Sequence, residues 1–330
     1  KTIPTVLPNV KYYGGNKIIN GYNSNNTYEF YNIFRDKNTS IHSQNQQKLS
    51  HKYYLSKSFM KYNSKITGEA EIYNQLFETE NKLLQSNEFH SGTHYRLFPI
   101  IGMSIESPFK LNKGLFDFTY KPHTQFVLTP GISNTNKISN EDSSNNNFTI
   151  ENITNLNRYS GSDKMDNSKR IIYGLNIYNE TTKIDIFQSY EFTDNSNFHS
   201  EQGNDDKLSD LLGSIEYKND YELNYNFRYD ANENFLKKQN INSNTPNRFG
   251  EINLSYLDQK SKTDGIITQD TETLNYSYKS KKFLNFSKIQ ISGLYDLQKE
   301  INTEYGIGYS YFDECFGINI DFNRKSYEED

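Results

Sequence analysis

The chain has 330 residues, of which 34% are hydrophobic and 23% are charged, and its formal net charge is -5. A mean hydropathy of -0.89, with no long apolar run, excludes a bundle of membrane helices, and the lack of a basic excess argues against a nucleic-acid partner. The 27 tyrosines and 22 phenylalanines exclude a disordered chain, since such chains contain few aromatic residues.

Alternating apolar and polar residues predict strands along the chain, beginning with residues 6–13. The longest unbroken alternation, Tyr221–Tyr229, matches the ~9–11 residues of a tilted strand that spans a membrane. Because the period is two rather than 3.6, each strand has two unlike faces. The same pattern recurs in shorter stretches at residues 116–120, 252–256, 305–311 and 318–323.

A large antiparallel transmembrane β-barrel reconciles this polar chain with its many aromatic rings, because such a barrel needs apolar residues only on its lipid face. In the longest stretch, we expect the apolar residues Tyr221, Leu223, Tyr225, Phe227 and Tyr229 to face lipid. The polar residues between them should face the lumen, and these are Glu222, Asn224, Asn226 and Arg228. A soluble β-sandwich or β-solenoid also alternates, but the Tyr-rich apolar faces favour the barrel.

Long polar stretches alternate with short connections, as outer loops and periplasmic turns do in such barrels. The long stretches are 133–147, 194–206 and 231–247, and a short connection is 218–220. We expect Ser133–Asn147 to lie outside the membrane, on the same side as the loop that holds Asp205 and Asp206. About 20 residues for each strand with its connection gives roughly 14 strands in one domain, without a linker.

Motifs for catalysis or metal binding are weak. His90 and His94 share a strand face, but a zinc site needs three or four ligands and no further His or Cys stands near. Asp163 and Asp166 lie in a turn whose spacing does not match an EF-hand calcium loop. We find no phosphate-binding loop and no nucleophile elbow, and therefore expect neither an enzyme nor a bound metal or cofactor.

A distinctive motif begins at Asn157 and reads N-R-Y-S-G-S-D-K-M, followed by K-R and Y-G-L up to Leu175. It resembles the "N-R-F-S-G-x-D-R … R-x-x-Y-G-L" signature of the LptD (OstA) family, the lipopolysaccharide-assembly proteins of the bacterial outer membrane. Lys164 replaces the usual Arg, and the acidic-Pro pair expected before the Gln strand is absent. Other matches to the family follow its order, at residues 95–99, 107–109, 123–127, 140–143, 311–316 and 323–324.

The resemblance implies an outer-membrane translocon that inserts lipopolysaccharide into the outer leaflet. Implied partners are lipopolysaccharide, an LptE-like lipoprotein plug, and the periplasmic lipopolysaccharide-transport bridge, which docks on an amino-terminal jellyroll. We expect residues 1–330 to be part of one barrel domain that lacks the family's jellyroll. We also expect the signal peptide to be absent, since Lys1 is not a methionine and no apolar segment follows it. Two alternatives remain open: a passive porin or plugged receptor barrel, and a secreted soluble β-structured surface protein.

Cys315 is the only cysteine of the chain. It could be a small packing residue, but an unpaired cysteine in an exported protein suggests a partner elsewhere. The family links a carboxy-terminal barrel cysteine to one near the amino terminus, and this resemblance makes Cys315 a disulfide candidate.

Charged residues of the signature could form an ion network inside a wide lumen; these are Arg158, Asp163, Lys164, Asp166 and Arg170. The alternative is a solvated turn, in which each ion pair contributes ~0–1 kcal/mol. In the family, this segment lies beside the lipoprotein plug where one is present. We therefore expect an ordered structural or plug-facing role for Asn157, Arg158, Tyr159, Ser160, Gly161, Asp163, Lys164, Asp166 and Arg170.

Overall fold

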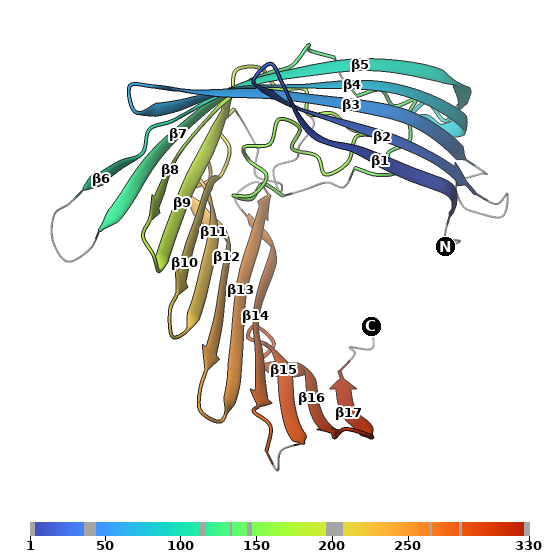
Figure 1. Cartoon of the computed structure of the whole chain (residues 1–330). Coiled ribbons are helices and arrows are strands. Elements are labelled where there is room, and N and C mark those ends of the chain that lie inside the picture. Colours follow the sequence, from blue (N-terminus) through green and yellow to red (C-terminus); the bar gives the residue numbers. More distant parts are fainter. Residues whose placement is uncertain are drawn as a thin grey trace. The chain divides into compact units, whose positions relative to one another are not determined.

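The computed structural model describes residues 4–35, 44–111, 117–132, 134–143, 147–195, 207–263, 266–283 and 286–326. In these ranges the chain forms 17 strands of one antiparallel sheet and no helix (Figure 1). Among the described residues, therefore, no helix is long and apolar enough to cross a membrane. The strands are β1 (Thr5–Ile19), β2 (Tyr22–Phe34), β3 (Asn45–Lys61), β4 (Ser64–Leu83), β5 (Phe89–Glu106), β6 (Phe109–Leu111), β7 (Phe118–Leu128), β8 (Lys169–Tyr178), β9 (Thr182–Glu191), β10 (Leu211–Lys218), β11 (Glu222–Asp230), β12 (Phe235–Pro246), β13 (Gly250–Thr263), β14 (Ile266–Ser280), β15 (Ser287–Asp296), β16 (Ile301–Phe312) and β17 (Gly317–Lys325).

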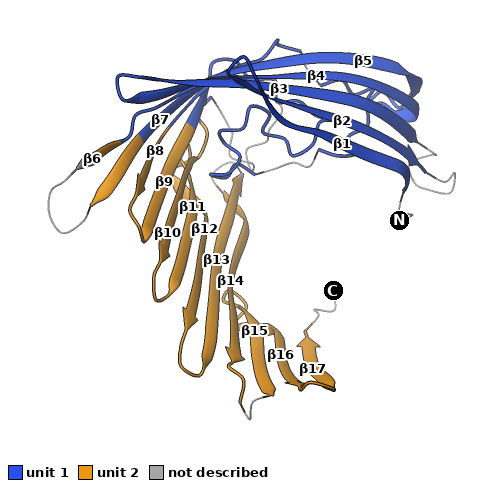
Figure 2. Cartoon of the chain, viewed as in Figure 1, with its two compact units in different colours: residues 1–108, 122–173, 189–208 blue, residues 109–121, 174–188, 209–330 orange. Residues whose placement is uncertain are grey.

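The chain clusters into two compact units, shown in separate colours in Figure 2. Unit 1 contains residues 1–108, 122–173 and 189–208, and unit 2 contains residues 109–121, 174–188 and 209–330. Strands β7, β8 and β9 each contribute residues to both units. The expectation of a single barrel domain stays a prediction.

The strand count of roughly 14 was too low, for two reasons. Very short turns join some of the consecutive strands: Asn20 and Gly21 connect β1 to β2, and both have the positive φ angles that tight hairpin turns require. In addition, Ala231–Asn247 is not a long loop, because most of it forms strand β12, which pairs with β11 and β13. The three-residue strand β6 adds one further short element.

The expected strand stretches are otherwise confirmed. Tyr221–Tyr229 corresponds to β11, and residues 252–256, 305–311 and 318–323 lie within β13, β16 and β17. Residues 6–13 lie within β1, whereas β7 begins at Phe118, and Phe116 falls outside the described residues. In β11, Arg228 is buried on the face opposite to Phe227 and lies 3.3 Å from Asp210, so it belongs to a charged cluster rather than an apolar belt.

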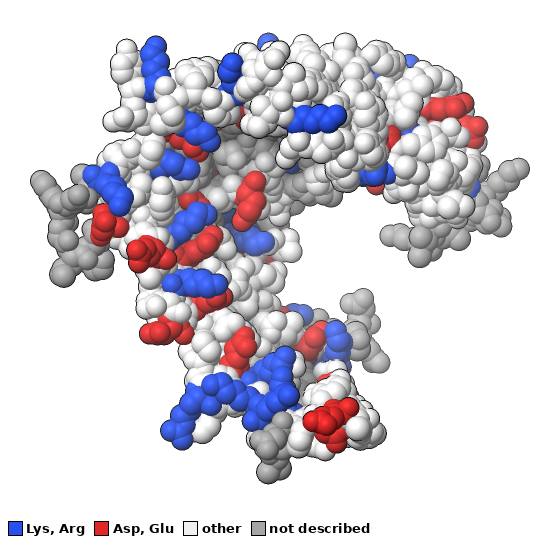
Figure 3. Space-filling view, in the orientation of Figure 1, with Lys and Arg blue, Asp and Glu red and all other residues white. Residues whose placement is uncertain are grey.

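In unit 1 the sheet buries charged side chains on its covered face, beside apolar ones such as Phe98 and Ile100, and it exposes large apolar side chains on the other face. On β3, Lys48 is fully buried while the neighbouring Leu49 is 55% exposed. On β5, Arg96 is 8% exposed and Ile101 is 59% exposed. The uncovered face is apolar, and in Figure 3 the surface over β3–β5 is mostly uncharged. A large exposed apolar face indicates a surface that contacts something other than water.

Candidate functional site

The inner segment, as we call residues 129–168, connects β7 to β8, and its described part covers one face of the sheet of unit 1. Its ends are tied together, because Ser168 N donates to Thr129 Oγ1 at 2.9 Å and Thr129 Oγ1 donates to Ser168 O at 3.0 Å. Figure 1 shows the segment in green beneath β1–β5. Its own buried apolar side chains are Ile138, Phe148, Ile153, Leu156, Tyr159 and Met165.

The expected outer loop at Ser133–Asn147 is part of this segment, and its place outside the membrane stays a prediction. In the described part, Ser139 accepts hydrogen bonds from Gln44 at 2.5 Å and Gln46 at 2.9 Å, and Ser143 is 3% exposed. These residues are therefore packed on strands rather than solvated. The loop that holds Asp205 and Asp206 lies outside the described residues.

Lys48 of β3 is the centre of a buried ion cluster between the sheet and the inner segment. Its Nζ lies 2.5 Å from Asp142, 2.9 Å from Asp163 and 3.1 Å from Glu29 of β2. The hydroxyl of Tyr31 donates to Asp163 at 3.0 Å. We call these five residues the Lys48 cluster. They come from β2, β3 and both halves of the inner segment, so the cluster joins all of these parts.

The two carboxylates of the inner segment differ in pKa. Burial opposes ionisation of Asp142, but Lys48 and the backbone N–H of Asp163 outweigh it and hold the pKa of Asp142 below its ordinary value. For Asp163, burial dominates over Lys48, and the nearby Asp142 adds repulsion, so its pKa is raised. Lys48 is thus the main group that keeps both carboxylates charged.

Arg96 of β5 clamps the backbone of the signature turn. Its guanidinium donates to Ser162 O at 2.6 Å and to Asp163 O at 2.8 Å. The same guanidinium donates to Gln75 Oε1 at 2.7 Å, and Gln75 in turn donates to Ser162 O at 2.9 Å. A planar donor with several fixed N–H groups suits this role, because it can hold two carbonyl groups at once.

Glycine is required at position 161. A Cβ atom there would overlap both the backbone oxygen and the carboxylate of Asp142. Close approach of the backbone at Gly161 to Asp142 lets Ser162 N donate to Asp142 Oδ1 at 3.0 Å. The glycine of the signature therefore serves close packing within the inner segment.

A second ion cluster, the Arg158 cluster, is buried where the inner segment joins β8. Arg158 lies 2.5 Å from Asp166 and 2.5 Å from Glu191 of β9, and Arg170 lies 3.0 Å from Asp166. All four side chains are at most 1% exposed. Burial would raise the pKa of Asp166, but Arg158 and Arg170 hold it below its ordinary value. Such a buried network fixes one geometry, since removing one member leaves a charge uncompensated.

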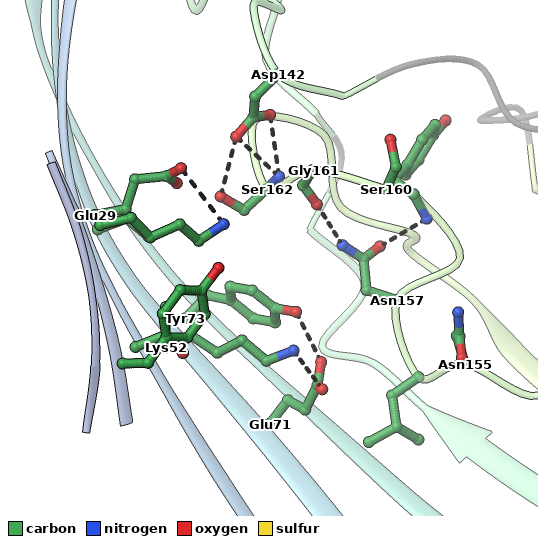
Figure 4. Close-up of a pocket in the computed structure, with 16 residues that line it drawn as sticks. Glu29, Lys52, Glu71, Tyr73, Asp142, Asn155, Asn157, Ser160, Gly161 and Ser162 are labelled. Carbon is green, nitrogen blue, oxygen red and sulfur yellow. Dashed lines mark hydrogen bonds and ion pairs between the residues drawn. The ribbon is translucent and has the colours of Figure 1, made fainter. Parts of the chain in front are cut away.

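A polar cavity of about 430 Å³ remains between β1–β4 and the inner segment (Figure 4). Lys52 and Tyr73 both contact Glu71 on the strand side, at 2.6 Å and 2.7 Å. On the other side, Asn157 donates to Gly161 O at 3.2 Å. The lining residues are Lys11, Tyr13, Thr27, Glu29, Ser50, Lys52, Glu71, Tyr73, Asp142, Asn155, Leu156, Asn157, Tyr159, Ser160, Gly161 and Ser162.

The expected ion network of the signature is divided between the two clusters. Arg158, Asp166 and Arg170 lie together, whereas Asp163 belongs to the Lys48 cluster and Lys164 Nζ lies 5.8 Å from the ring centre of Tyr159. Asn157 and Tyr159 are buried, while Ser160 is exposed at the cavity. Their plug-facing role stays a prediction.

Sequence reasoning missed the strand partners of these residues, namely Glu29, Tyr31, Lys48 and Glu191, and it did not assign Asp142 to an ion cluster. The strand partners could have been recognised from the sequence, because each charged one stands at a polar position of a strand with alternating polar and apolar residues. Lys48 stands between Gln46 and Ser50 on the polar face of β3, and Glu191 follows Ser189 on β9. An ionised residue on a covered face needs a partner of opposite charge.

Cys315 lies in the turn between β16 and β17 and is exposed. Its backbone N–H donates to Asp313 at 2.9 Å, and the pKa of this carboxyl is lowered by that bond, the Tyr311 hydroxyl and the N–H of Phe316. The exposed position at a strand end agrees with the expected location, and the disulfide stays a prediction.

Other titratable groups do not form a metal site in the described part of the chain. The Nε2 atoms of His90 and His94 lie 2.9 Å apart, and no group of three or more potential ligands occurs among the described residues.

In unit 2, Asp210 is buried beside Arg228 at 3.3 Å and Lys237 at 3.3 Å. Burial outweighs these two cations and raises the pKa of Asp210 to about 6.

A long antiparallel sheet with a covered polar face and an exposed apolar face is typical of strand-built membrane proteins. The chain matches the family of LPS transport system D, LptD, over residues 1–301, and it therefore belongs to this family. This result confirms the resemblance of the signature motifs and gives the chain a role in lipopolysaccharide transport and assembly at the outer membrane. No curated protein matches the chain.

Proposed function

We propose that the chain forms part of the barrel wall of an outer-membrane translocon, and that this translocon inserts lipopolysaccharide into the outer leaflet at the cell surface. The observation that carries this proposal is in unit 1, where the charged Lys48 and Arg96 are covered while the apolar Leu49 and Ile101 are exposed. Membership of the LptD family indicates that the transported molecule is lipopolysaccharide. The chain acts as a transport protein and not as an enzyme.

Transport of this amphiphile requires a hydrated path for its polar part beside an apolar path for its acyl chains. The sugars of lipopolysaccharide need hydrogen-bonding surroundings, while its acyl chains must stay out of water. An antiparallel sheet meets both demands, because alternate side chains of each strand point to opposite faces. Closure of the sheet into a barrel places the polar face inside and the apolar face in the bilayer.

The proposed partners follow from the same arrangement. An LptE-like lipoprotein plug would meet the inner segment, whose two ion clusters give it a fixed surface. The periplasmic transport bridge would connect through a jellyroll that precedes the barrel in the family. A disulfide from Cys315 would tie such a domain to the turn between β16 and β17, since this cysteine is exposed there.

Depletion of the protein in the bacterium that carries it tests the proposal. We expect newly made lipopolysaccharide to disappear from the cell surface, measured by antibody labelling of intact cells, and to remain in permeabilised cells. Restoring the wild-type gene is the control and should recover the surface label. Unchanged surface lipopolysaccharide after depletion would contradict the proposed function.

A further inference from the structure

The cavity between β1–β4 and the inner segment has the size and the chemistry of a ligand site. Its volume of about 430 Å³ lies within the ~300–1,000 Å³ of small-molecule pockets. Figure 4 shows side chains of the strands and of the signature turn pointing toward one another across it. Both walls belong to unit 1.

The charges on the cavity wall are already paired within the protein. Glu71 has Lys52 at 2.6 Å, and Asp142 has Lys48 at 2.5 Å. Glu29 has Lys48 at 3.1 Å and Lys11 at 3.8 Å. An anionic ligand would have to compete with these carboxylates for the lysines, and a cationic ligand would compete with the lysines for the carboxylates. The wall therefore favours an uncharged ligand.

The remaining lining groups are hydroxyls, amides and aromatic rings. Tyr13, Tyr73 and Tyr159 supply rings from β1, β4 and the inner segment. Hydroxyl groups of Thr27 and Ser160 and the amide of Asn155 line the same space. Rings offer apolar faces and hydroxyls offer both donors and acceptors, which together suit a ligand with C–H faces and many hydroxyl groups.

We propose that this cavity binds a short stretch of uncharged saccharide. The inference rests on the proposed function for the origin of the ligand, which is the polysaccharide part of lipopolysaccharide. Binding at this cavity would give the signature turn a second role, contact with the ligand, because the turn forms one wall of the cavity. The signature residues in that wall are Asn157, Tyr159, Ser160 and Gly161.

The chain offers a matched pair of variants on β1. Tyr13 lines the cavity and is 63% exposed, and Tyr12 is 62% exposed but points to the opposite face of the strand. Both residues pair with β2, opposite Thr27 and Tyr28. Truncation of either ring removes little buried surface, so Tyr13→Ala and Tyr12→Ala should both fold.

Binding is measured with the purified full chain in an amine-oxide detergent, because maltoside detergents carry a competing sugar. Maltotriose and a mannose trisaccharide are the neutral probes, and trigalacturonate is the anionic probe of equal length. Titrations followed by saturation-transfer NMR should give a Kd of about 1 mM or tighter for at least one neutral probe. Trigalacturonate should bind at least about tenfold more weakly.

Tyr13→Ala should weaken binding of the neutral probe at least about fivefold, and Tyr12→Ala should change it less than about twofold. The proposal is overturned if neither neutral probe binds, if trigalacturonate binds as well, or if the two variants behave alike. Polysaccharide released from lipopolysaccharide by mild acid should displace the neutral probe. If it does not, the assignment of the ligand to lipopolysaccharide is wrong and a free saccharide is the ligand.

These outcomes are separate from the test of the proposed function. Binding is read from purified protein, whereas the transport role is read from surface lipopolysaccharide in depleted cells. Loss of surface lipopolysaccharide without saccharide binding would reject only the site, and binding without a transport defect would reject only the function.

Discussion

Replacing Lys48 by methionine should destabilise unit 1 strongly, because three carboxylates would lose their central cation. The ammonium group lies 2.5, 2.9 and 3.1 Å from Asp142, Asp163 and Glu29, and the side chain is fully buried. At an effective dielectric constant of ~20, each contact near 3 Å corresponds to about 5 kcal/mol of attraction. Desolvation offsets most of this attraction, and breaking a buried pair typically costs about 3–5 kcal/mol.

The penalty should depend on pH. Lys48 lowers the pKa of both Asp142 and Asp163, so its removal raises both and disfavours the ionised forms in the folded state. When the pKa of a carboxyl is higher in the folded state than in the unfolded state, the folded protein loses stability as the pH rises above the unfolded-state pKa of ~3.9. The variant should therefore differ more from wild type at pH 7 than at pH 4.

Guanidinium unfolding of the protein in detergent, followed by circular dichroism at both pH values, measures this difference. The control is Lys57→Met on the same strand, where the exposed Lys57 lies 4.4 Å from the ring centre of Tyr22, and it should cost less than about 1 kcal/mol. Equal stability of the two variants, or a penalty that does not shrink at pH 4, would refute the role assigned to the Lys48 cluster.

Three further changes test other parts of the chain. Leu223→Arg should cost ~2–4 kcal/mol if this residue is near the bilayer midplane, whereas Asn224→Arg on the opposite face should cost less than about 1 kcal/mol, as measured by unfolding from lipid vesicles. Asp210→Asn should abolish the loss of stability between about pH 4 and 6, the interval from the ordinary unfolded pKa to the folded pKa of about 6, and an unchanged pH slope in unfolding would count against this assignment. If Cys315 pairs with an upstream cysteine, Cys315→Ser should remove the difference in mobility between reducing and non-reducing gels, and identical mobility in the wild-type protein would exclude the pairing.

The alternating strands were predictable because their pattern is local. Tyr221–Tyr229 has one apolar and one polar face, and a period of two is visible within nine residues. Strand β12 was missed for the same reason, since polar residues such as Lys238 and Gln239 stand on both of its faces. Its assignment depends on pairing with β11 and β13, which no local pattern contains.

The candidate site was only partly predictable, because its partners are distant in the chain. The signature pointed to Asp163 and Arg158 as members of an ordered network. It did not reveal that Asp163 pairs with Lys48 or that Arg158 pairs with Glu191. The packing of residues 134–143 on the strands was not predictable, because a polar composition fits both a solvated loop and a segment that covers a strand face.

The Lys48 cluster also has a consequence for the order in which the chain can fold. Tyr31 and Asp163 are 132 residues apart, and Lys48 and Asp142 are 94 residues apart. The two-residue turn between β1 and β2 lets these strands pair early, but Lys48 gains Asp142 and Asp163, two of its three carboxylate partners, only when the inner segment arrives. Until then, hydration must satisfy Lys48 and Arg96, so this wall stays wet. A chain that ends before residue 163 would therefore leave Lys48 without Asp163 and Arg96 without the carbonyl group of Asp163, and water would have to take both places.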